Sequence, residues 1–392
     1  MIGGGNDSFM GEIHRKAIKQ TGCLSLVCGA FGSTRNSSYE TGKRLGLPTR
    51  RVYGTYRELF RRERSLPVGE RADFITIVTP NAMHYPISMS ALDTRFPILT
   101  EKPFTCNLDE ALNLLRKQQT NRIPYGICMV YPSYPMLQKA RALIREKEAL
   151  GIIRKIVVSY ESGWMSPRLE TAGNHQAGWR TDPRRCGAAG CLADLGSHCA
   201  YLAEWLTGLK LVEVCADLYS GVPGRIIDDD CTVMARFENG IHGVFLSSQI
   251  DTGSARGLCC KIIGDQASLV WRQSTPDLLQ LTAQDGTVTL MGDPAPSPES
   301  GSVPCPSAPS GDNDGYLKAL TETYRSFAAY VQSGGKSPAR FMTVEEGLRS
   351  VVFVDAALRN GTEPPAGAAQ DEGDAQQKQK WESIEIPEIQ AL

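Results

Sequence analysis

Apolar segments alternate with amphipathic segments along the first third of the chain. Residues 24–31 and 73–79 are short, apolar and rich in β-branched side chains, a pattern typical of strands buried in a parallel sheet. Residues 97–100 add a third strand end. Helical stretches lie between and after these strands, at residues 38–45, 55–62, 86–92 and 108–118. This alternation predicts an α/β domain built on a doubly wound parallel sheet.

The pattern changes near Gly151, beyond which most apolar segments have the length of strands. Asn239-Gly240 between two of these segments is a strong signal for a two-residue hairpin turn. We therefore expect an α+β region with a large, open and mainly antiparallel sheet, completed by helices at residues 316–332 and 343–359. The expected strands are residues 152–160, 211–219, 231–237, 241–250, 258–263 and 268–271.

Two stretches have the composition of loops or tails. Residues 292–313 are rich in proline, serine and glycine and predict a long surface loop. Residues 361–380, dominated by Ala, Gly, Gln, Glu, Asp and Lys, indicate disorder. The predicted organisation is a Rossmann dinucleotide-binding domain over residues 1–128, a substrate-binding and oligomerisation domain over residues 129–360, and a disordered tail over residues 361–392.

Glycines at the start of the chain predict a dinucleotide loop. Gly3 and Gly5 are followed by Gly11, which opens a helix and would let the backbone approach a pyrophosphate at the helix N-terminus. The spacing is longer than the usual fingerprint, and a glycine-rich start is equally often a flexible terminus. Only Met1-Ile2 precede the glycines, whereas a strand needs about five residues. Either the start site is misassigned or the central strand is truncated, which would leave its neighbours without ladder partners.

Composition and charge narrow the class of partner. The 392 residues contain 42 Lys and Arg against 43 Asp and Glu, a balance that argues against nucleic acid or an acidic membrane surface and favours a small neutral substrate. The start of the chain lacks a signal-peptide pattern and no segment approaches a membrane span, so we expect a cytoplasmic protein. The twelve cysteines show no zinc spacing, which predicts reduced thiols and no metal site.

Asp194 and His198 are four residues apart in a stretch of helical character, so one turn of helix would place a carboxylate and an imidazole on the same face. Histidine titrates near neutrality and a nearby acid can hold its ring in one tautomer. The two residues therefore form a candidate proton-transfer pair, although a helix-surface pair is the commoner explanation of this spacing.

The residues after the expected strand at 24–31 bear on the choice of cofactor. An NAD-selective site usually has an acidic residue there, whereas this chain has Ser33-Thr34-Arg35. Ser33 and Arg35 are suited to the 2′-phosphate of NADP, and ordinary turn residues are the alternative interpretation. We expect NADP or NAD as the cofactor, with NADP slightly favoured.

Four motifs add up to a resemblance. They are Val78-Thr79-Pro80-Asn81-Ala-Met-His84, Glu101-Lys102-Pro103, Gly178-Trp179-Arg180-Thr181-Asp182-Pro183 and Asp194-Leu-Gly-Ser-His198. Their order and spacing resemble those of the Gfo/Idh/MocA family, which includes glucose-fructose oxidoreductase and inositol 2-dehydrogenase. The resemblance spans residues 2–360. It implies a Rossmann domain followed by a domain whose open sheet often forms an oligomer interface, so a homodimer or homotetramer is expected.

The resemblance also implies roles for individual residues. Lys102 corresponds to the catalytic lysine, and Asp194 and His198 to the acid/base pair: His198 would accept the proton of a carbinol and Lys102 would stabilise the developing alkoxide. Packing, surface or helix-capping roles remain alternatives for Trp179, Arg180 and His84. The expected cofactor-binding residues are Gly3, Gly5, Gly11, Ser33, Arg35, Thr79, Pro80, Asn81, His84, Glu101, Lys102, Trp179 and Arg180.

The predicted function is that of an NAD(P)-dependent oxidoreductase acting on the CH-OH group of a sugar, sugar derivative or cyclitol. Two alternatives remain open at this point. A nicotinamide-dependent glycosidase, acting by transient oxidation and elimination, would cleave glycosides without a net change in NAD(P)H. A non-catalytic scaffold of the same family would bind neither NAD⁺ nor NADP⁺.

Overall fold

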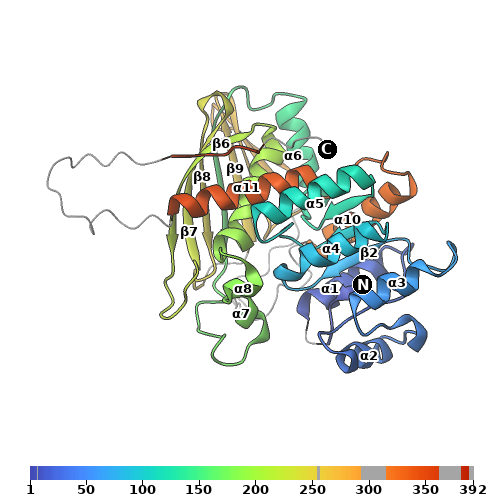
Figure 1. Ribbon diagram of the computed structural model, residues 1–392. Helices are drawn as coiled ribbons and strands as arrows, with labels where there is room; N and C mark the ends of the chain where they lie inside the picture. The colour runs from blue at the N-terminus through green and yellow to red at the C-terminus, as the bar shows by residue number, and fades with distance from the viewer. Residues whose placement is uncertain (7, 254–256, 293–314, 362–380, 388–392) are drawn as a thin grey trace, which may run out of the picture.

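The computed structural model describes residues 1–6, 8–253, 257–292, 315–361 and 381–387, and two sheets organise this part of the chain (Figure 1). The first sheet is parallel, with the order β1-β2-β3-β4. Its strands are β1 (Ile2–Gly3), β2 (Ile75–Val78), β3 (Ile98–Thr100) and β4 (Tyr125–Ile127). The predicted doubly wound α/β fold is confirmed.

The helices of this region alternate with the strands and connecting segments as predicted. Thr34 and Thr55 each cap a helix with a side-chain oxygen, which accepts the backbone N–H three residues on. The helices are α1 (Phe9–Gln20), α2 (Arg35–Arg44), α3 (Tyr56–Arg64), α4 (His84–Asp93) and α5 (Leu108–Asn121), with short 3-10 turns η1 (Thr49–Arg51) and η2 (Asn81–Met83). Each predicted helix of this region is therefore present.

The first strand, β1, is short, as expected, and it therefore offers few hydrogen-bond partners to the segment beside it. Gly3 donates to the carbonyl oxygen of Ala30 at 2.9 Å, and Ala30 donates to that of Met1 at 3.0 Å. The prediction of a full strand over residues 24–31 is wrong, because that segment makes only isolated bridges, at Gly29 and Ala30. A strand exists only where a ladder partner runs beside it, and β1 offers two residues.

The second sheet has nine strands in the order β12-β11-β10-β9-β5-β8-β7-β6-β13. Its neighbours are antiparallel except for β5 and β8, which are parallel, so the sheet is mixed but mainly antiparallel, as predicted. Asn239 and Gly240 both have positive φ angles, of 63° and 73°, and form the predicted turn between β7 and β8. The strands are β5 (Ile153–Glu161), β6 (Leu211–Tyr219), β7 (Asp230–Phe237), β8 (His242–Ser248), β9 (Gly257–Gly264), β10 (Ala267–Arg272), β11 (Leu279–Ala283), β12 (Val288–Met291) and β13 (Glu382–Ser383).

Helices cover one face of this sheet. Figure 1 shows α6 and α11 on the same side of it, and α9 packs against β5 and β8. Ile156 and Val158 of β5 are fully buried beneath the helices, whereas Val157 between them is partly exposed on the other face. The remaining elements are α6 (Pro135–Arg145), α7 (His175–Arg180), α8 (Pro183–Cys186), α9 (Ser197–Thr207), α10 (Tyr316–Gln332), α11 (Val344–Gly361) and the turns η3 (Tyr131–Ser133), η4 (Leu192–Gly196) and η5 (Glu238–Gly240).

The predictions of a long surface loop and of a disordered tail can be compared with the structure only in part. Residues 293–313 of the predicted loop and 362–380 and 388–392 of the predicted tail lie outside the described residues. The prediction of a disordered tail is wrong for Glu382–Ser383, which form β13 against β6. Glu382 pairs with Arg359 at 2.9 Å and Ile384 is 9% exposed, so an ion pair and apolar burial hold this segment in place. Within the described ranges, no helix has the length and hydrophobicity needed to cross a membrane.

Candidate active site

Lys102 and Asp194, 92 positions apart in the chain, are in direct contact. Lys102 follows β3, and Asp194 lies in η4, a π-helical turn that leads into α9. The Lys102 Nζ atom donates to Asp194 Oδ1 at 2.5 Å and to the Asp194 main-chain oxygen at 3.0 Å. Because a lysine ammonium has three N–H groups, these two bonds leave one donor available.

The second carboxylate oxygen of Asp194 also faces donors. Gln249 Nε2 donates to Asp194 Oδ2 at 2.9 Å, and Arg180 Nε lies 3.5 Å from the same oxygen. Burial alone would raise the pKa of the Asp194 carboxyl, but the charges of Lys102 and Arg180 hold that pKa well below its ordinary value. Asp194 is therefore an anion at neutral pH and accepts hydrogen bonds rather than protons.

The π-helical turn that carries Asp194 is fixed from outside by Asp228. The Asp228 carboxylate accepts from Gly190 N and Leu192 N, both at 2.6 Å, and its main-chain oxygen accepts from Cys191 N at 2.9 Å. The first backbone N–H groups of a helix have no acceptor within the helix, and a carboxylate can serve as their acceptor. π-Helical turns are rare and occur often at functional sites.

We predict that Asp228→Ala lowers the free energy of unfolding by about 3 kcal/mol, because two buried N–H groups lose a charged acceptor. Urea unfolding of the variant and of the unmodified protein measures the change. Asp217→Ala is the control, since Asp217 lies exposed on β6. Equal losses in the two variants would contradict the proposed support of the turn.

His198 is buried on α9, with 8% of its surface exposed. Its ring lies between two aromatic rings, with centroid distances of 5.5 Å to Tyr131 and 5.3 Å to Tyr160, and is nearly perpendicular to both. The segment from Asp194 to His198 begins in the π-helical turn, so its geometry differs from the regular α-turn predicted from the spacing. The aromatic rings restrict the orientation of the imidazole.

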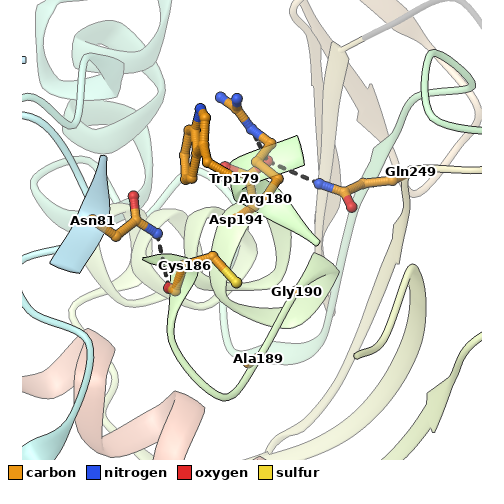
Figure 2. Close-up of a pocket in the computed structure, with 8 residues that line it drawn as sticks. All are labelled: Asn81, Trp179, Arg180, Cys186, Ala189, Gly190, Asp194 and Gln249. Atoms are coloured by element: carbon orange, nitrogen blue, oxygen red, sulfur yellow. Dashed lines mark hydrogen bonds and ion pairs between the residues drawn. The ribbon is translucent and has the colours of Figure 1, made fainter. Parts of the chain in front are cut away.

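A small cleft of about 230 Å³ opens beside Asp194. Figure 2 shows Trp179 and Arg180 along one side of it and Gln249 reaching Asp194 from the other. Asn81 donates to the main-chain oxygen of Cys186 at 3.0 Å, so it connects η2 to the end of α8. The lining residues are Asn81, Trp179, Arg180, Cys186, Ala189, Gly190, Asp194 and Gln249.

Trp179 and Arg180 form a stacked layer at this cleft. The Arg180 guanidinium lies 4.1 Å from the Trp179 ring centroid and 5.7 Å from that of Trp164. Gln176 Oε1 accepts from Arg180 Nη1 at 2.8 Å, which holds the guanidinium in place. The layer presents an aromatic surface and a positive charge, a combination that suits both sugar rings and nicotinamide.

The predicted dinucleotide loop has the close backbone approaches that such a loop requires. A Cβ on Gly3, whose φ is +79°, would lie 2.5 Å from Val78 O, and one on Gly5 would lie 2.6 Å from Phe31 O. A Cβ on Gly11 would lie 2.4 Å from the Gly4 Cα, so α1 can approach the loop only with glycine there. Ser8 caps α1 by accepting from Gly11 N at 3.0 Å. Gly3, Gly5 and Gly11 therefore form a cradle that fits a dinucleotide phosphate.

Thr79 and Pro80 follow β2 at the edge of this cradle. The Thr79 hydroxyl is buried and has no hydrogen-bond partner among the described residues. A buried polar atom of this kind costs free energy unless a ligand or a water satisfies it. Its place beside the glycine loop fits a bound nucleotide. Pro80 directly precedes η2, which carries Asn81.

His84 and Glu101 are directed into the protein rather than into the cleft. The two ring nitrogens of His84 lie 2.8 Å from Pro103 O and 3.0 Å from Thr79 O, and burial lowers the pKa of this imidazole. The ring thus links the loops after β2 and β3, and its side chain does not cap α4. Glu101 Oε1 lies 2.8 Å from His14 Nε2, and Glu101 Oε2 accepts from Lys102 N at 3.2 Å.

His14 connects this second carboxylate to the core. Its Nδ1 lies 2.7 Å from the Tyr324 hydroxyl, which lies 2.9 Å from Thr76 Oγ1. Cys128 lies close to the pair, since its sulfur and the nearest atoms of His14 and Glu101 are within 4.8 Å of one another. Hydrogen bonds occupy both ring nitrogens of His14, so this group acts as a network that fixes the residue before Lys102.

Ser33 and Arg35 lie at the surface, next to the start of α2. Arg35 Nη2 lies 3.2 Å from Glu58 Oε2 and its guanidinium is 6.0 Å from the Tyr39 ring centroid. Glu58 contacts Arg35 from α3 rather than from the local sequence, and its carboxylate also accepts from Gly54 N. The sequence does not indicate a role at the site for Glu58, Gln249, Asp228 or His14, because none of these residues belongs to a recognised motif.

The comparisons with known proteins assign the family. Residues 1–125 match the model of an oxidoreductase family with an NAD-binding Rossmann fold, and residues 137–270 match the GFO/IDH/MocA C-terminal domain. The chain belongs to the Gfo/Idh/MocA family of oxidoreductases, in agreement with the motifs. An uncharacterised oxidoreductase of Bacillus subtilis, YfiI, is 29% identical over 301 residues, which cover 75% of each protein.

A homologue of inositol dehydrogenase and a levoglucosan dehydrogenase are also similar to this chain. The structure of an inositol dehydrogenase homologue from Azotobacter vinelandii with NAD⁺ superposes with a TM-score of 0.81 and 28% identity, covering 92% of this chain and 94% of that one. The same homologue is known in complex with NADH and myo-inositol, with a TM-score of 0.79. Levoglucosan dehydrogenase of Pseudarthrobacter phenanthrenivorans is 23% identical over 420 residues, covering 100% of this chain and 98% of its own.

Proposed function

We propose that this oxidoreductase transfers hydride between a nicotinamide cofactor and a secondary carbinol of a polyhydroxylated ring, a cyclitol or a sugar. The observation that carries the proposal is the contact between Lys102 and Asp194, a residue that lines the small cleft. The inositol dehydrogenase homologue and levoglucosan dehydrogenase, whose names state such substrates, support the same class. The near balance of charges in the chain agrees with a neutral substrate.

The residues of the site divide the chemistry between them. A bound nicotinamide supplies the hydride acceptor. Lys102 directs its remaining N–H to the substrate oxygen and stabilises negative charge there, while Asp194 keeps the ammonium aimed. His198 accepts the proton of the carbinol in the oxidative direction and returns it to a carbonyl in the reverse direction.

We propose the glycine cradle, Thr79 and Asn81 as the cofactor site, with Trp179 and Arg180 at its nicotinamide end. Lys102 belongs to both sites. His84 and Glu101 serve this site indirectly, through the loops that they hold. Pro80 sets the backbone between Thr79 and Asn81. Ser33 and Arg35 lie where an adenosine ribose would be recognised, and we propose that they favour NADP over NAD.

The test of the function combines binding with turnover. We expect titration with NADH and NADPH to show binding to the purified protein, and a panel of cyclitols and sugars to include a compound that is oxidised with net reduction of the cofactor. Glycoside cleavage without net reduction would replace the proposal by the glycosidase mechanism. Absence of binding to both cofactors by folded protein would overturn every enzymatic alternative.

A variant of Arg35 tests the cofactor preference. We expect Arg35→Ala to weaken NADPH binding about tenfold and NADH binding by much less, since only NADPH has the 2′-phosphate that a guanidinium binds. Fluorescence titration with both cofactors measures the effect. Arg57→Ala, an exposed arginine of α3, is the control. Equal weakening of both cofactors would remove the assigned phosphate contact.

We also propose that the uncovered face of the nine-stranded sheet forms a homodimer or homotetramer interface. Val157, Val244 and Met234 are register neighbours across β5, β8 and β7, and all three are partly exposed on that face. A row of apolar side chains on an open sheet favours burial against another surface. Light scattering coupled to size-exclusion chromatography measures the mass in solution, and a monomer would contradict this assembly.

A further inference from the structure

Gln249 is a buried polar residue that none of the motifs contains. It follows β8 and is 3% exposed. Its backbone is held on both sides, because its N–H donates to Asp229 O at 2.8 Å and its carbonyl oxygen accepts from Met165 N at 3.1 Å. The side chain therefore extends toward Asp194 from a fixed position (Figure 2).

The contact with Asp194 determines how the amide is oriented. A carboxylate only accepts hydrogen bonds, so the amide nitrogen of Gln249 faces Asp194 and the amide oxygen points elsewhere. Within the described part of the chain, no donor reaches that oxygen at hydrogen-bond distance. Gln249 lines the cleft, so its oxygen is an acceptor at the place where a substrate would lie.

We propose that Gln249 is a positioning and specificity-determining residue: its amide nitrogen holds Asp194 in place for Lys102, and its amide oxygen accepts a hydrogen bond from a substrate hydroxyl next to the reacting carbinol. The inference rests on the proposed function. It predicts a preference for substrates with two adjacent hydroxyl groups, because one meets Lys102 and the other meets Gln249.

The neutrality of Gln249 is the chemical basis of this role. A glutamate at this position would place a second carboxylate about 3 Å from Asp194, where two negative charges cannot both persist, so the pKa of one rises strongly. In its protonated form the glutamate would still donate to Asp194, as glutamine does. Once it ionises, repulsion would displace Asp194 and with it the ammonium of Lys102.

The first experiment compares the pH profiles of Gln249→Glu and Gln249→Leu. At each pH the activity of Gln249→Glu is compared with that of the unmodified enzyme, and we expect this ratio to be highest at low pH and to fall as pH rises, between about pH 5 and pH 8, which gives the variant a descending limb absent from the unmodified enzyme. We expect Gln249→Leu to lose about tenfold or more in kcat/KM at every pH, with a higher KM for vicinal diols than for substrates with an isolated hydroxyl.

Gln273 provides the matched control. It is equally buried, at 4% exposed, and lies in the same sheet region, but its amide contacts the Tyr134 hydroxyl and Leu258 N rather than the cleft. Gln273→Glu should keep the pH profile of the unmodified enzyme. A descending limb in both variants, or in neither, would overturn the positioning role, and an unchanged KM pattern in Gln249→Leu would overturn the substrate contact.

A second measurement needs no turnover and separates this inference from the proposed function. In Gln249→Glu, the raised pKa of the introduced carboxyl in the folded state stabilises the fold at low pH. That contribution disappears as pH rises from the carboxyl's unfolded pKa of about 4.3. The Tm of Gln249→Glu should therefore fall with pH relative to the unmodified protein. Adding Asp194→Asn should abolish this fall, because the asparagine donates to the new carboxylate.

The same Asp194→Asn change should leave the pH dependence of Gln273→Glu unaltered. If the double variant with Gln249→Glu still loses stability with pH, the pairing of these two side chains is refuted whether or not the enzyme turns over a polyol. If the pairing holds and no polyol reacts, the proposed function fails and the substrate contact fails with it. Double-variant cycles of this kind isolate the pairwise interaction.

Discussion

Replacing Lys102 by alanine is expected to lower kcat/KM by ~10² or more, because the ammonium that stabilises negative charge on the substrate oxygen is lost. Cofactor binding should change far less, since the glycine cradle is unaffected. The loss should be mainly in kcat, as expected for an interaction that strengthens in the transition state. Steady-state kinetics with the best substrate of the panel and titration with NADH make the comparison.

Lys155→Ala is the control, because Lys155 is an exposed lysine of β5. Asp194 keeps Gln249 and Arg180 as partners in the Lys102 variant, so we expect the protein to remain folded. With Lys102 gone, the pKa of Asp194 should rise, since the largest of the charge effects that lower it is removed. Activity within about threefold of the unmodified enzyme would remove Lys102 from the mechanism.

The second large effect is expected for His198. Replacing it by glutamine should lower kcat/KM for oxidation by ~10² or more, because the group that accepts the carbinol proton is lost. Steady-state kinetics of the variant and the unmodified enzyme with the best substrate of the panel measure the loss.

Glutamine retains most of the volume between Tyr131 and Tyr160, which limits loss of packing. His242→Gln, at an exposed position of β8, is the control for the chemical change itself. Asp194 is ionised at neutral pH, since its pKa is well below the ordinary value, but the charges of Lys102 and Arg180 that lower this pKa also make it a weak base. Activity of the variant within about threefold of the unmodified enzyme would show that another residue is the base.

Much of the fold follows from periodicity. The helices α2 to α5 and the strands β5 to β10 lie where the pattern of apolar positions predicts them, because each buries one face in a regular layer. The expected strand at residues 24–31 fails for a reason that no local pattern contains, namely the length of its partner β1. The short strands β11 and β12, at one end of the large sheet, were missed because they are partly or largely exposed and so have no clear alternation.

The site was partly predictable from sequence. The motifs identify Lys102, Asp194 and His198, but not the partners that define their states. The Gln249 side chain contacts Asp194 across 55 positions of the chain, and the Asp228 carboxylate contacts the π-helical turn and the residue Gly190 before it across 36 to 38 positions. A single sequence gives no signal for contacts over such separations. Likewise, Glu101 belongs to a motif with Lys102, yet its carboxylate turns to His14 in the core, a direction that only packing determines.

The π-helical turn at Leu192–Gly196 makes the site depend on the count of residues as well as on their identity. Successive residues of a helix are rotated by about 100°. Deleting Ala193 would convert the turn toward regular α-helix and rotate its preceding residues out of register with Asp228, while each remaining side chain kept its chemistry. The alignment of this short segment with Asp228 is thus a property of its length, which a substitution that keeps every residue in place does not alter.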